Sequence, residues 1–477
     1  METYETDRRS RAALCTRPNS AGGMLSCLRR SPWIAPLAAA LTLFGCCAAM
    51  AALQRVSGNR AALFQNYRGP MNTRTPDGWS TTSPREGIAP RFEVAAGAGR
   101  AGSGALAIQG GGNAAAVGSW RRDWSPVRAG VTYRFTAWRR AEGVAYPTRS
   151  LTARLVWLDA RGQPARPPDY VPAVASEGAW TRMEHVCVAP ERAQTVRVEL
   201  TLAWAPDATV WWDDVSLTEE TPSAGRVVRA LTVYHRPQGT GAAARSVEEF
   251  CRLMERAADQ KPDVICLPEG VTVIGTGKSY AEVAESVPGP TTTRLGAAAR
   301  KLKSYICAGL YEREGKILYN TAVLLDREGR VAGKYRKTHL PREEVEAGLT
   351  PGSEYPVFQT DFGKVGMMIC WDLQFPEPSR ALALKGAELI LLPIWGGSDI
   401  LARARAMENH VFLITSSYDM KTFIVDPKGD VAAEATREQP LALAELHLDR
   451  KIVQPWLGDM RTRTWNERRA DLRVDGP

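Results

Sequence analysis

The chain has 477 residues, 44% hydrophobic and 24% charged, a balance that is typical of globular proteins and excludes collagen, disordered and multi-span membrane proteins. Its length predicts two or three domains. The net charge of +9 gathers at the N-terminus, where residues 1–60 carry eight arginines, and no dense basic stripe follows, which argues against nucleic-acid binding. Nine cysteines without a Cys-x-x-Cys or His-Glu-x-x-His motif exclude a disulfide scaffold and the common zinc sites, so we predict no metal and no cofactor.

An uncharged segment lies near the N-terminus. Residues 31–54, mostly Ala and Leu, follow a tail over 1–30 that ends in two arginines. Twenty-four residues suffice to cross a bilayer as a helix, and the basic flank would stay on the cytoplasmic side. We predict a transmembrane anchor, a signal peptide or a lipoprotein signal with Cys46 as the acylated residue, and hence an exported, membrane-anchored protein on the periplasmic side of the cell envelope. The alternative is an N-terminal helix packed on the fold of a cytoplasmic protein.

Residues 61–220 have the pattern of an all-β domain. This region holds nine of the 14 tryptophans and no lysine. Apolar residues alternate with polar ones in several runs, as at Val131, Tyr133 and Phe135, and turn-forming Gly, Pro and Asp clusters separate these runs. Such alternation is typical of half-buried strands, and no long helical pattern appears. We therefore predict an antiparallel β-sandwich.

Three segments of this region, 104–108, 129–135 and 210–217, resemble the jelly-roll modules of the carbohydrate-binding, galactose-binding-like type. The resemblance implies a jelly-roll fold and a carbohydrate ligand. Tryptophan could stack on a sugar ring, but in a sandwich it more often fills the core. A spacer or dimerisation element is the other interpretation of this domain.

After a linker at 221–226, strands alternate with helices, which predicts an α/β domain over 227–450 and a C-terminal extension over 451–477. Ser246-Val247-Glu248-Glu249 predicts a capping box at the start of a helix. The apolar face of that helix holds Val247, Phe250, Cys251 and Met254.

Three residues of the α/β domain are candidates for chemistry. Glu269 follows the short apolar strand 263–267, at the strand end where open α/β sheets bind ligands. Lys337 lies in a basic segment that could equally be a solvated turn. Cys370 ends an apolar strand and precedes a helix from about Glu377, which places it on a strand-to-helix elbow. Backbone N–H groups at such an elbow lower the pKa of a thiol, whereas a buried inert cysteine is the other interpretation.

Together, Pro268-Glu269, Lys337-Thr338-His339-Leu340 and Cys370-Trp371-Asp372 resemble the nitrilase, or carbon–nitrogen hydrolase, superfamily. The resemblance covers about 227–450 and includes three intervening pieces at 319–324, 350–352 and 389–393. It implies a four-layer αββα sandwich and a Glu269–Lys337–Cys370 triad. Many members are homo-oligomers, so the resemblance also implies a homo-oligomer.

The chemistry of the family explains these residue types. A thiolate of Cys370 would attack the poor electrophile, and Glu269 would move the proton. Lys337 and the backbone N–H of Trp371 would stabilise the oxyanion. The following residues match supporting positions of the family: Glu344 or Glu346 as a second glutamate, Trp395 as a pocket or core residue, and Asn409 as a structural hydrogen-bonding residue.

The residue after the Cys-Trp pair suggests the reaction. Nitrile-specific members usually carry Glu there, and Asp372 is similar to the amidase and carbamoylase branches. We therefore predict hydrolysis of a small-molecule amide or N-carbamoyl substrate. Two alternatives stay open: an N-acyltransferase with the same triad, and a catalytically silent surface binding protein.

Overall fold

The computed structural model describes residues 78–454 and 457–469. The predicted anchor at 31–54 and the tail before it lie outside these residues. Within them, no helix is long and apolar enough to cross a membrane. The described residues therefore do not support the prediction of an exported, membrane-anchored protein, which rested on an apolar stretch of sequence alone.

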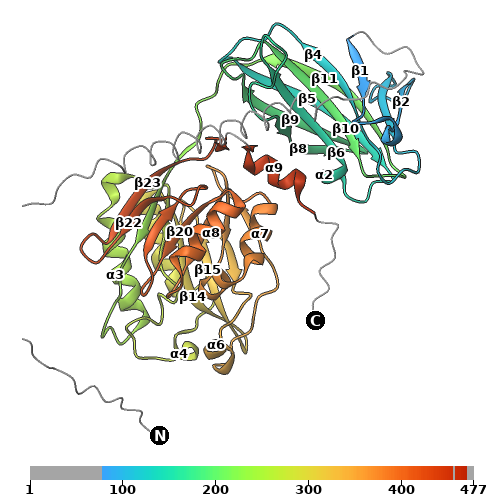
Figure 1. Cartoon of the computed structure of the whole chain (residues 1–477). Helices are drawn as coiled ribbons and strands as arrows, with labels where there is room; N and C mark the ends of the chain where they lie inside the picture. The colour runs from blue at the N-terminus through green and yellow to red at the C-terminus, as the bar shows by residue number, and fades with distance from the viewer. Residues whose placement is uncertain (1–77, 455–456, 470–477) are drawn as a thin grey trace, which may run out of the picture. The chain divides into compact units, whose positions relative to one another are not determined.

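The first part of the described chain is an all-β sandwich of two antiparallel sheets (Figure 1). One sheet has the order β1 (Trp79–Thr82), β4 (Val117–Trp124), β10 (Thr195–Ala203), β6 (Leu151–Leu158) and β7 (Asp169–Val171). The other has the order β2 (Arg91–Ala95), β3 (Ala105–Gln109), β11 (Thr209–Glu219), β5 (Thr132–Glu142), β9 (Trp180–Val188) and β8 (Ala173–Glu177).

The sandwich core explains much of the tryptophan content. Trp120, Trp157 and Trp212 are fully buried and pack with Phe135 between the two sheets. The period-two alternation in the sequence therefore reflects a shared interior, as predicted. The jelly-roll assignment, the resemblance to carbohydrate-binding modules and the carbohydrate ligand stay predictions.

The second part of the chain stacks four layers. The first sheet has the order β16 (Val331–Arg336), β15 (Ile317–Leu325), β14 (Tyr305–Glu314), β13 (Val264–Cys266), β12 (Val227–Val233) and β23 (Leu441–His447). The second has the order β17 (Val357–Gln359), β18 (Lys364–Met367), β19 (Leu389–Pro393), β20 (Phe412–Ser416), β21 (Thr422–Val425) and β22 (Val431–Ala435).

Three apolar clusters hold these layers together. Helices α3 (Ala243–Glu255) and α5 (Pro290–Leu302) cover the first sheet. The two sheets pack face to face, and α7 (Pro376–Leu384) and α8 (Asp399–Asn409) cover the second. Figure 1 shows α3 and the α7/α8 pair on opposite flanks of the strands. This arrangement is the predicted αββα sandwich.

The predicted capping box is wrong. Helix α3 begins at Ala243, three residues before Ser246. The Ser246 hydroxyl is fully buried, donates to the carbonyl of Ile274 at 2.7 Å and bonds the Thr240 hydroxyl at 2.8 Å. It therefore ties the helix to a neighbouring loop instead of capping it. The predicted apolar face is correct, because Val247, Phe250, Cys251 and Met254 are all buried.

We propose that the chain is divided as predicted, with a linker at 221–226. The last strand of the sandwich ends at Glu219 and the first strand of the α/β sheets begins at Val227, which supports these bounds. The extension over 451–477 contains helix α9 (Met460–Glu467).

Candidate active site

Glu269, Lys337 and Cys370 follow strands of the two facing sheets. Glu269 comes three residues after β13, Lys337 directly follows β16, and Cys370 begins the short helix η4 (Cys370–Gln374) three residues after β18. Strands β13 and β18 each lie in a parallel set, β12–β13–β14 and β18–β19–β20. Residues that follow parallel strands gather at the carboxyl edge of the sheet, where open α/β folds bind ligands.

The backbone around Glu269 is fixed by close packing. A Cβ atom at Gly309 on β14 would meet the Glu269 Cα at 2.7 Å, so a side chain there would push Glu269 away. The Tyr418 hydroxyl donates to the main-chain oxygen of Glu269 at 3.0 Å. These contacts hold the carboxylate-bearing segment against the sheet.

A buried ionic cluster surrounds Lys337. Its ammonium contacts Glu269 Oε1 at 2.9 Å and Glu344 Oε1 at 3.0 Å, and the three side chains are 1%, 3% and 5% exposed. Asn320 bridges the same two oxygens, because its Nδ2 donates to Glu269 Oε1 at 2.7 Å and to Glu344 Oε1 at 2.6 Å. Two carboxylates thus share one ammonium and one amide.

Two buried oxygens of the cluster accept no hydrogen bond. Glu269 Oε2 accepts from the backbone N–H of Trp395 at 3.0 Å, but Glu344 Oε2 and Asn320 Oδ1 have no partner although they are buried. Buried polar atoms are usually paired, and an unpaired one needs a reason, of which a role in binding or catalysis is one. Because it has one cation for two carboxylates, the cluster also favours binding of a ligand that carries a hydrogen-bond donor or a positive charge.

Burial and charge shift the ionisation of these groups. Burial alone would lower the pKa of Lys337, but the neighbouring Glu269, Cys370 and Glu344 outweigh it and raise the pKa well above its usual value. The pKa of Glu344 is also raised, because burial and the charge of Glu269 outweigh the opposing effect of Lys337. Lys337 therefore stays cationic at neutral pH.

The Cys370 thiol differs from the sequence prediction in its pKa. The residue has a φ of +43°, so the elbow is a strained turn, and its thiol lies 3.8 Å from the carbonyl of Gly396. Burial and the charge of Glu269 raise the pKa of the thiol to about 12, against the opposing effect of Lys337. The predicted lowering is therefore wrong, because desolvation outweighs the charge that favours the thiolate.

The structure separates the two candidate second glutamates. Both lie on helix α6 (Arg342–Glu346), but only Glu344 faces Lys337. The Glu346 side chain is 60% exposed and pairs with Arg342 at 2.6 Å. The two residues are half a helical turn apart, so they point in different directions.

The remaining predicted residues take different positions. Trp371 is 41% exposed beside Cys370. Trp395 is half-buried, packs edge-to-face on Tyr418 with ring centroids 5.0 Å apart, and reaches the cluster through its backbone N–H. Asn409 is fully buried and its amide donates to the Ser379 hydroxyl at 3.0 Å, which links α8 to α7 as the predicted structural bond.

Asn320 is a site member that sequence reasoning missed. In the sequence, Tyr319-Asn320-Thr321 stands out only as part of the resemblance to the family. Its signal was nonetheless present, since β15 is a buried apolar strand with an amide at its centre. A buried amide in such a strand needs partners, which here are the two carboxylates.

In the part of the chain that the structure describes, the side chains of Asp169, His185 and Cys187 are the set close enough to share a metal ion. All three are buried in the sandwich. Asp169 accepts from the Trp157 indole at 2.8 Å and pairs with the Arg166 guanidinium. Burial raises the pKa of the Cys187 thiol to about 12. A dication would displace or repel Arg166, so we assign these residues to the core.

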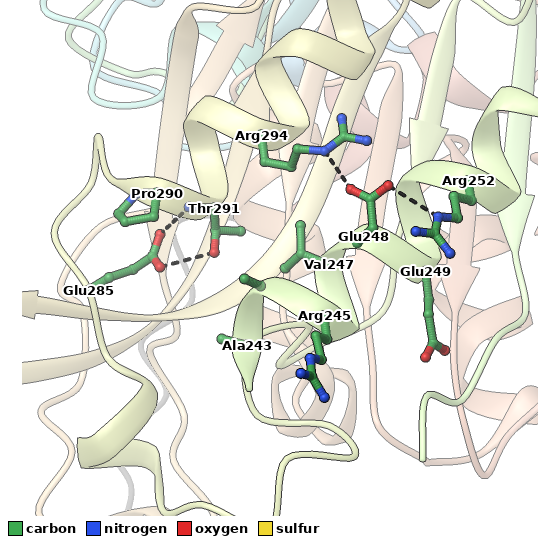
Figure 2. Close-up of a pocket in the computed structure, with 11 residues that line it drawn as sticks. Ala243, Arg245, Val247, Glu248, Glu249, Arg252, Glu285, Pro290, Thr291 and Arg294 are labelled. Carbon is green, nitrogen blue, oxygen red and sulfur yellow. Dashed lines mark hydrogen bonds and ion pairs between the residues drawn. The ribbon is translucent and has the colours of Figure 1, made fainter. Parts of the chain in front are cut away.

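A cavity of about 790 Å³ lies between α3 and α5 (Figure 2), and its lining shares no residue with the cluster around Lys337. Glu248 sits between Arg294 at 2.7 Å and Arg252 at 3.2 Å, and Glu285 accepts from the Thr291 backbone at 2.7 Å. Its lining holds no cysteine, and these carboxylates already have partners. The cavity therefore offers no nucleophile and no unpaired acid.

Comparison with known proteins shows which family the second part of the chain resembles. The carbon–nitrogen hydrolase family matches residues 232–456. The omega-amidase NIT2 of Xenopus tropicalis is 30% identical over 235 residues, 43% of this chain and 84% of that protein. A nitrilase of Pyrococcus abyssi is 37% identical over 218 residues, 41% of this chain and 81% of that protein.

Among solved structures, an amidase from Nesterenkonia sp. AN1 is similar at 25% identity and a TM-score of 0.41, over 47% of this chain and 96% of that chain. The curated relatives and the family match confirm the predicted superfamily. The chain belongs to the carbon–nitrogen hydrolase family of enzymes.

Proposed function

We propose that the protein hydrolyses the carbon–nitrogen bond of a small-molecule amide or N-carbamoyl compound through a thioester on Cys370. The main support is the buried cluster in which the Lys337 ammonium joins Glu269 and Glu344 and influences the Cys370 thiol. The similarity to an omega-amidase supports an amide substrate, and Asp372, at a position where nitrile-specific members usually carry Glu, favours it over a nitrile.

In the first step, the sulfur of Cys370 attacks the amide carbon while its proton passes to Glu269. A raised thiol pKa of about 12 means that the resting group is protonated, so attack and proton transfer go together. A carbon–sulfur bond forms and the carbonyl π electrons move to oxygen. The burial that holds the proton on sulfur also keeps the resting thiol from indiscriminate reaction.

Lys337 would stabilise the negative oxygen. An ammonium has three N–H donors, and Glu269 and Glu344 engage two of them, so the third can serve the oxyanion. The backbone N–H of Trp371, in the first turn of η4, would supply a second donor. The raised pKa of Lys337 keeps this charge in place across the neutral range.

The carbon–nitrogen bond then breaks, and the nitrogen leaves as ammonia or an amine with the proton from Glu269. Water attacks the thioester, Glu269 takes its proton, and the released thiolate is reprotonated. The unpaired Glu344 Oε2 is a natural acceptor for an N–H of the substrate amide. Glu344 thus holds the substrate amide, while Glu269 transfers the protons in both half-reactions.

The test is ammonia release by the full chain from amides, N-carbamoyl amines and nitriles. We compare Cys370→Ala with Cys251→Ala, a buried cysteine on α3 that lies outside the cluster. We expect release from amides or N-carbamoyl compounds, lost by at least about 10⁴-fold in Cys370→Ala and kept in Cys251→Ala.

Two results would overturn the proposal. Transfer of the acyl group to an added amine, with ammonia released but no free acid formed by water, would favour the N-acyltransferase alternative. No turnover, together with a Cys370 that is inert to iodoacetamide, would favour the silent binding protein.

A further inference from the structure

The Asp372 side chain makes several hydrogen bonds that the sequence did not predict. Its side chain is fully buried. Oδ2 accepts from the Tyr335 hydroxyl at 2.7 Å and from the Ile369 backbone N–H at 3.0 Å. Oδ1 is 3.1 Å from the Thr338 hydroxyl and 3.0 Å from both the backbone nitrogen and Nδ1 of His339.

These contacts come from two separate segments. Tyr335, Thr338 and His339 flank Lys337 on both sides, whereas Ile369 immediately precedes Cys370. One carboxylate therefore ties the lysine segment to the nucleophile elbow. The His339 ring also stacks on Phe375, just beyond η4, with centroids 4.1 Å apart.

We propose that Asp372 is a positioning residue that sets the separation of the Lys337 ammonium and the Cys370 thiol. The proposal rests on the thiol hydrolysis proposed above. Both oxygens of Asp372 are already engaged by donors from these two segments, so a link between this position and substrate preference should act through placement of the two groups. Asp and Glu differ by one methylene, and a displacement of about 1 Å can cost a catalytic site 10²-fold.

The geometry favours this role over simple stabilisation of the fold. An ionised carboxylate only accepts hydrogen bonds, and the donors that surround Asp372 match that capacity. Glutamate would keep the charge and the acceptors but move their position. Asparagine would keep the length but turn an amide N–H₂ toward other donors.

The test uses the full chain with Asp372→Glu, Asp372→Asn and Tyr335→Phe. Tyr335→Phe removes one of the donors to Asp372 and retains the buried ring, so it stays informative if the Asp372 variants fail to fold. Asp426→Asn is the control: Asp426 also accepts backbone N–H groups, from Lys428 and Asp430, but in a turn away from the cluster.

We measure kcat and KM for an amide and the pH dependence of Cys370 alkylation by iodoacetamide. For Asp372→Glu we expect kcat to fall about 100-fold with little change in KM, and the alkylation profile to move to higher pH. The profile moves because a displaced Lys337 no longer favours the thiolate. Tyr335→Phe should move it in the same direction by less, and Asp426→Asn should leave it unchanged.

A purely structural residue would lower the melting temperature and the folded fraction but leave the alkylation profile of the folded molecules as in the wild type. That result would overturn the proposal. Alkylation needs no substrate, so it also separates the two ideas. A wild type that hydrolyses neither amides nor N-carbamoyl compounds overturns the proposed function, while a moved profile in Asp372→Glu still supports the positioning role.

Discussion

The β-sandwich and the α/β domain both bury charged side chains, but they balance them in opposite ways. In the sandwich, Glu199 is 4% exposed and lies between Arg121 at 2.7 Å and Arg154 at 2.5 Å. In the α/β domain, Lys337 lies between Glu269 and Glu344 at 2.9 and 3.0 Å. The first cluster has two cations for one carboxylate, and the second has one cation for two carboxylates.

The pKa values follow this balance. Burial alone would raise the pKa of Glu199, but Arg154 and Arg121 outweigh it and lower the pKa. The pKa of Glu344 is raised instead. Glu312, also in the α/β domain and 2% exposed, pairs with Lys334 and Arg336 and has a lowered pKa. Burial raises the pKa of all three carboxylates, and only at Glu199 and Glu312 do two neighbouring cations outweigh it.

The contrast separates structural from functional buried charge. A carboxylate whose two oxygens are both paired with guanidinium groups stabilises the sheet. A cluster with unpaired acceptors and raised carboxylate pKa retains capacity to bind and to move protons. Substitutions in the two clusters should thus change different observables, stability in one and turnover in the other.

The largest expected effect is on turnover in Glu269→Gln. Loss of the proton carrier should lower kcat about 10⁴-fold. The melting temperature should change little, because Lys337 keeps Glu344 as a counter-ion. Hydrolysis assays and thermal unfolding of the full chain measure both quantities. Glu346→Gln, an exposed neighbour on α6, is the control and should behave as wild type. Near-normal turnover in Glu269→Gln would remove Glu269 from the proposed mechanism.

For Glu199→Gln we expect the opposite outcome, a loss of stability without a loss of turnover. Its two arginines would lose their buried counter-ion, which should lower the free energy of unfolding by about 3 kcal/mol. The kcat of the folded protein should stay unchanged. Urea denaturation followed by activity of the folded fraction tests this. Glu219→Gln, whose pair with Arg128 is exposed, should leave the denaturation curve in place. A loss of kcat in Glu199→Gln would contradict the division of roles.

Local patterns predicted most of what positions the site. Glu269 and Cys370 each follow a short apolar run, and such runs become strands, here one in each of the two facing sheets, with the functional residue beyond the carboxyl end. The order of the three motifs then indicated the family. These features depend on neighbours in the sequence, so they could be predicted without the fold.

The partners of these residues could not be predicted in the same way. Asn320 and Glu269 are 51 residues apart, and no periodicity links an amide in one strand to a carboxylate beyond another. Glu344 and Glu346 differ only in which side of a helical turn they occupy. The thiol pKa depends on burial by distant segments, and this is why the elbow argument predicted the wrong direction for Cys370.

A smaller effect is expected for Asn320→Asp. The change replaces an amide that donates to both carboxylates with a third carboxylate. Loss of two hydrogen bonds to charged groups should lower kcat/KM by about tenfold or more. Asn320 lowers the pKa of Glu344. Its removal should therefore raise that pKa and move the acid limb of the pH–rate profile to higher pH.

The control for this prediction is Thr321→Val, the next residue of β15, whose hydroxyl bonds Glu312 at 2.8 Å and not the cluster around Lys337. It should leave the acid limb in place. An acid limb that moves to lower pH in Asn320→Asp would contradict the role of the bridging amide.

The smallest expected effect is an increase and not a loss. It concerns the rate at which iodoacetamide alkylates the Cys370 thiol. A pKa of about 12 leaves the thiol protonated at neutral pH, so the rate of alkylation by iodoacetamide should keep rising with pH well beyond neutrality. The charge of Glu269 contributes to that raised pKa. Glu269→Gln should therefore lower the pKa of Cys370 and speed alkylation at neutral pH, by several-fold, while hydrolysis is lost. Slower alkylation in this variant would mean that the carboxylate assists the thiol by taking its proton even without substrate, and that its negative charge is not the larger influence on the resting sulfur.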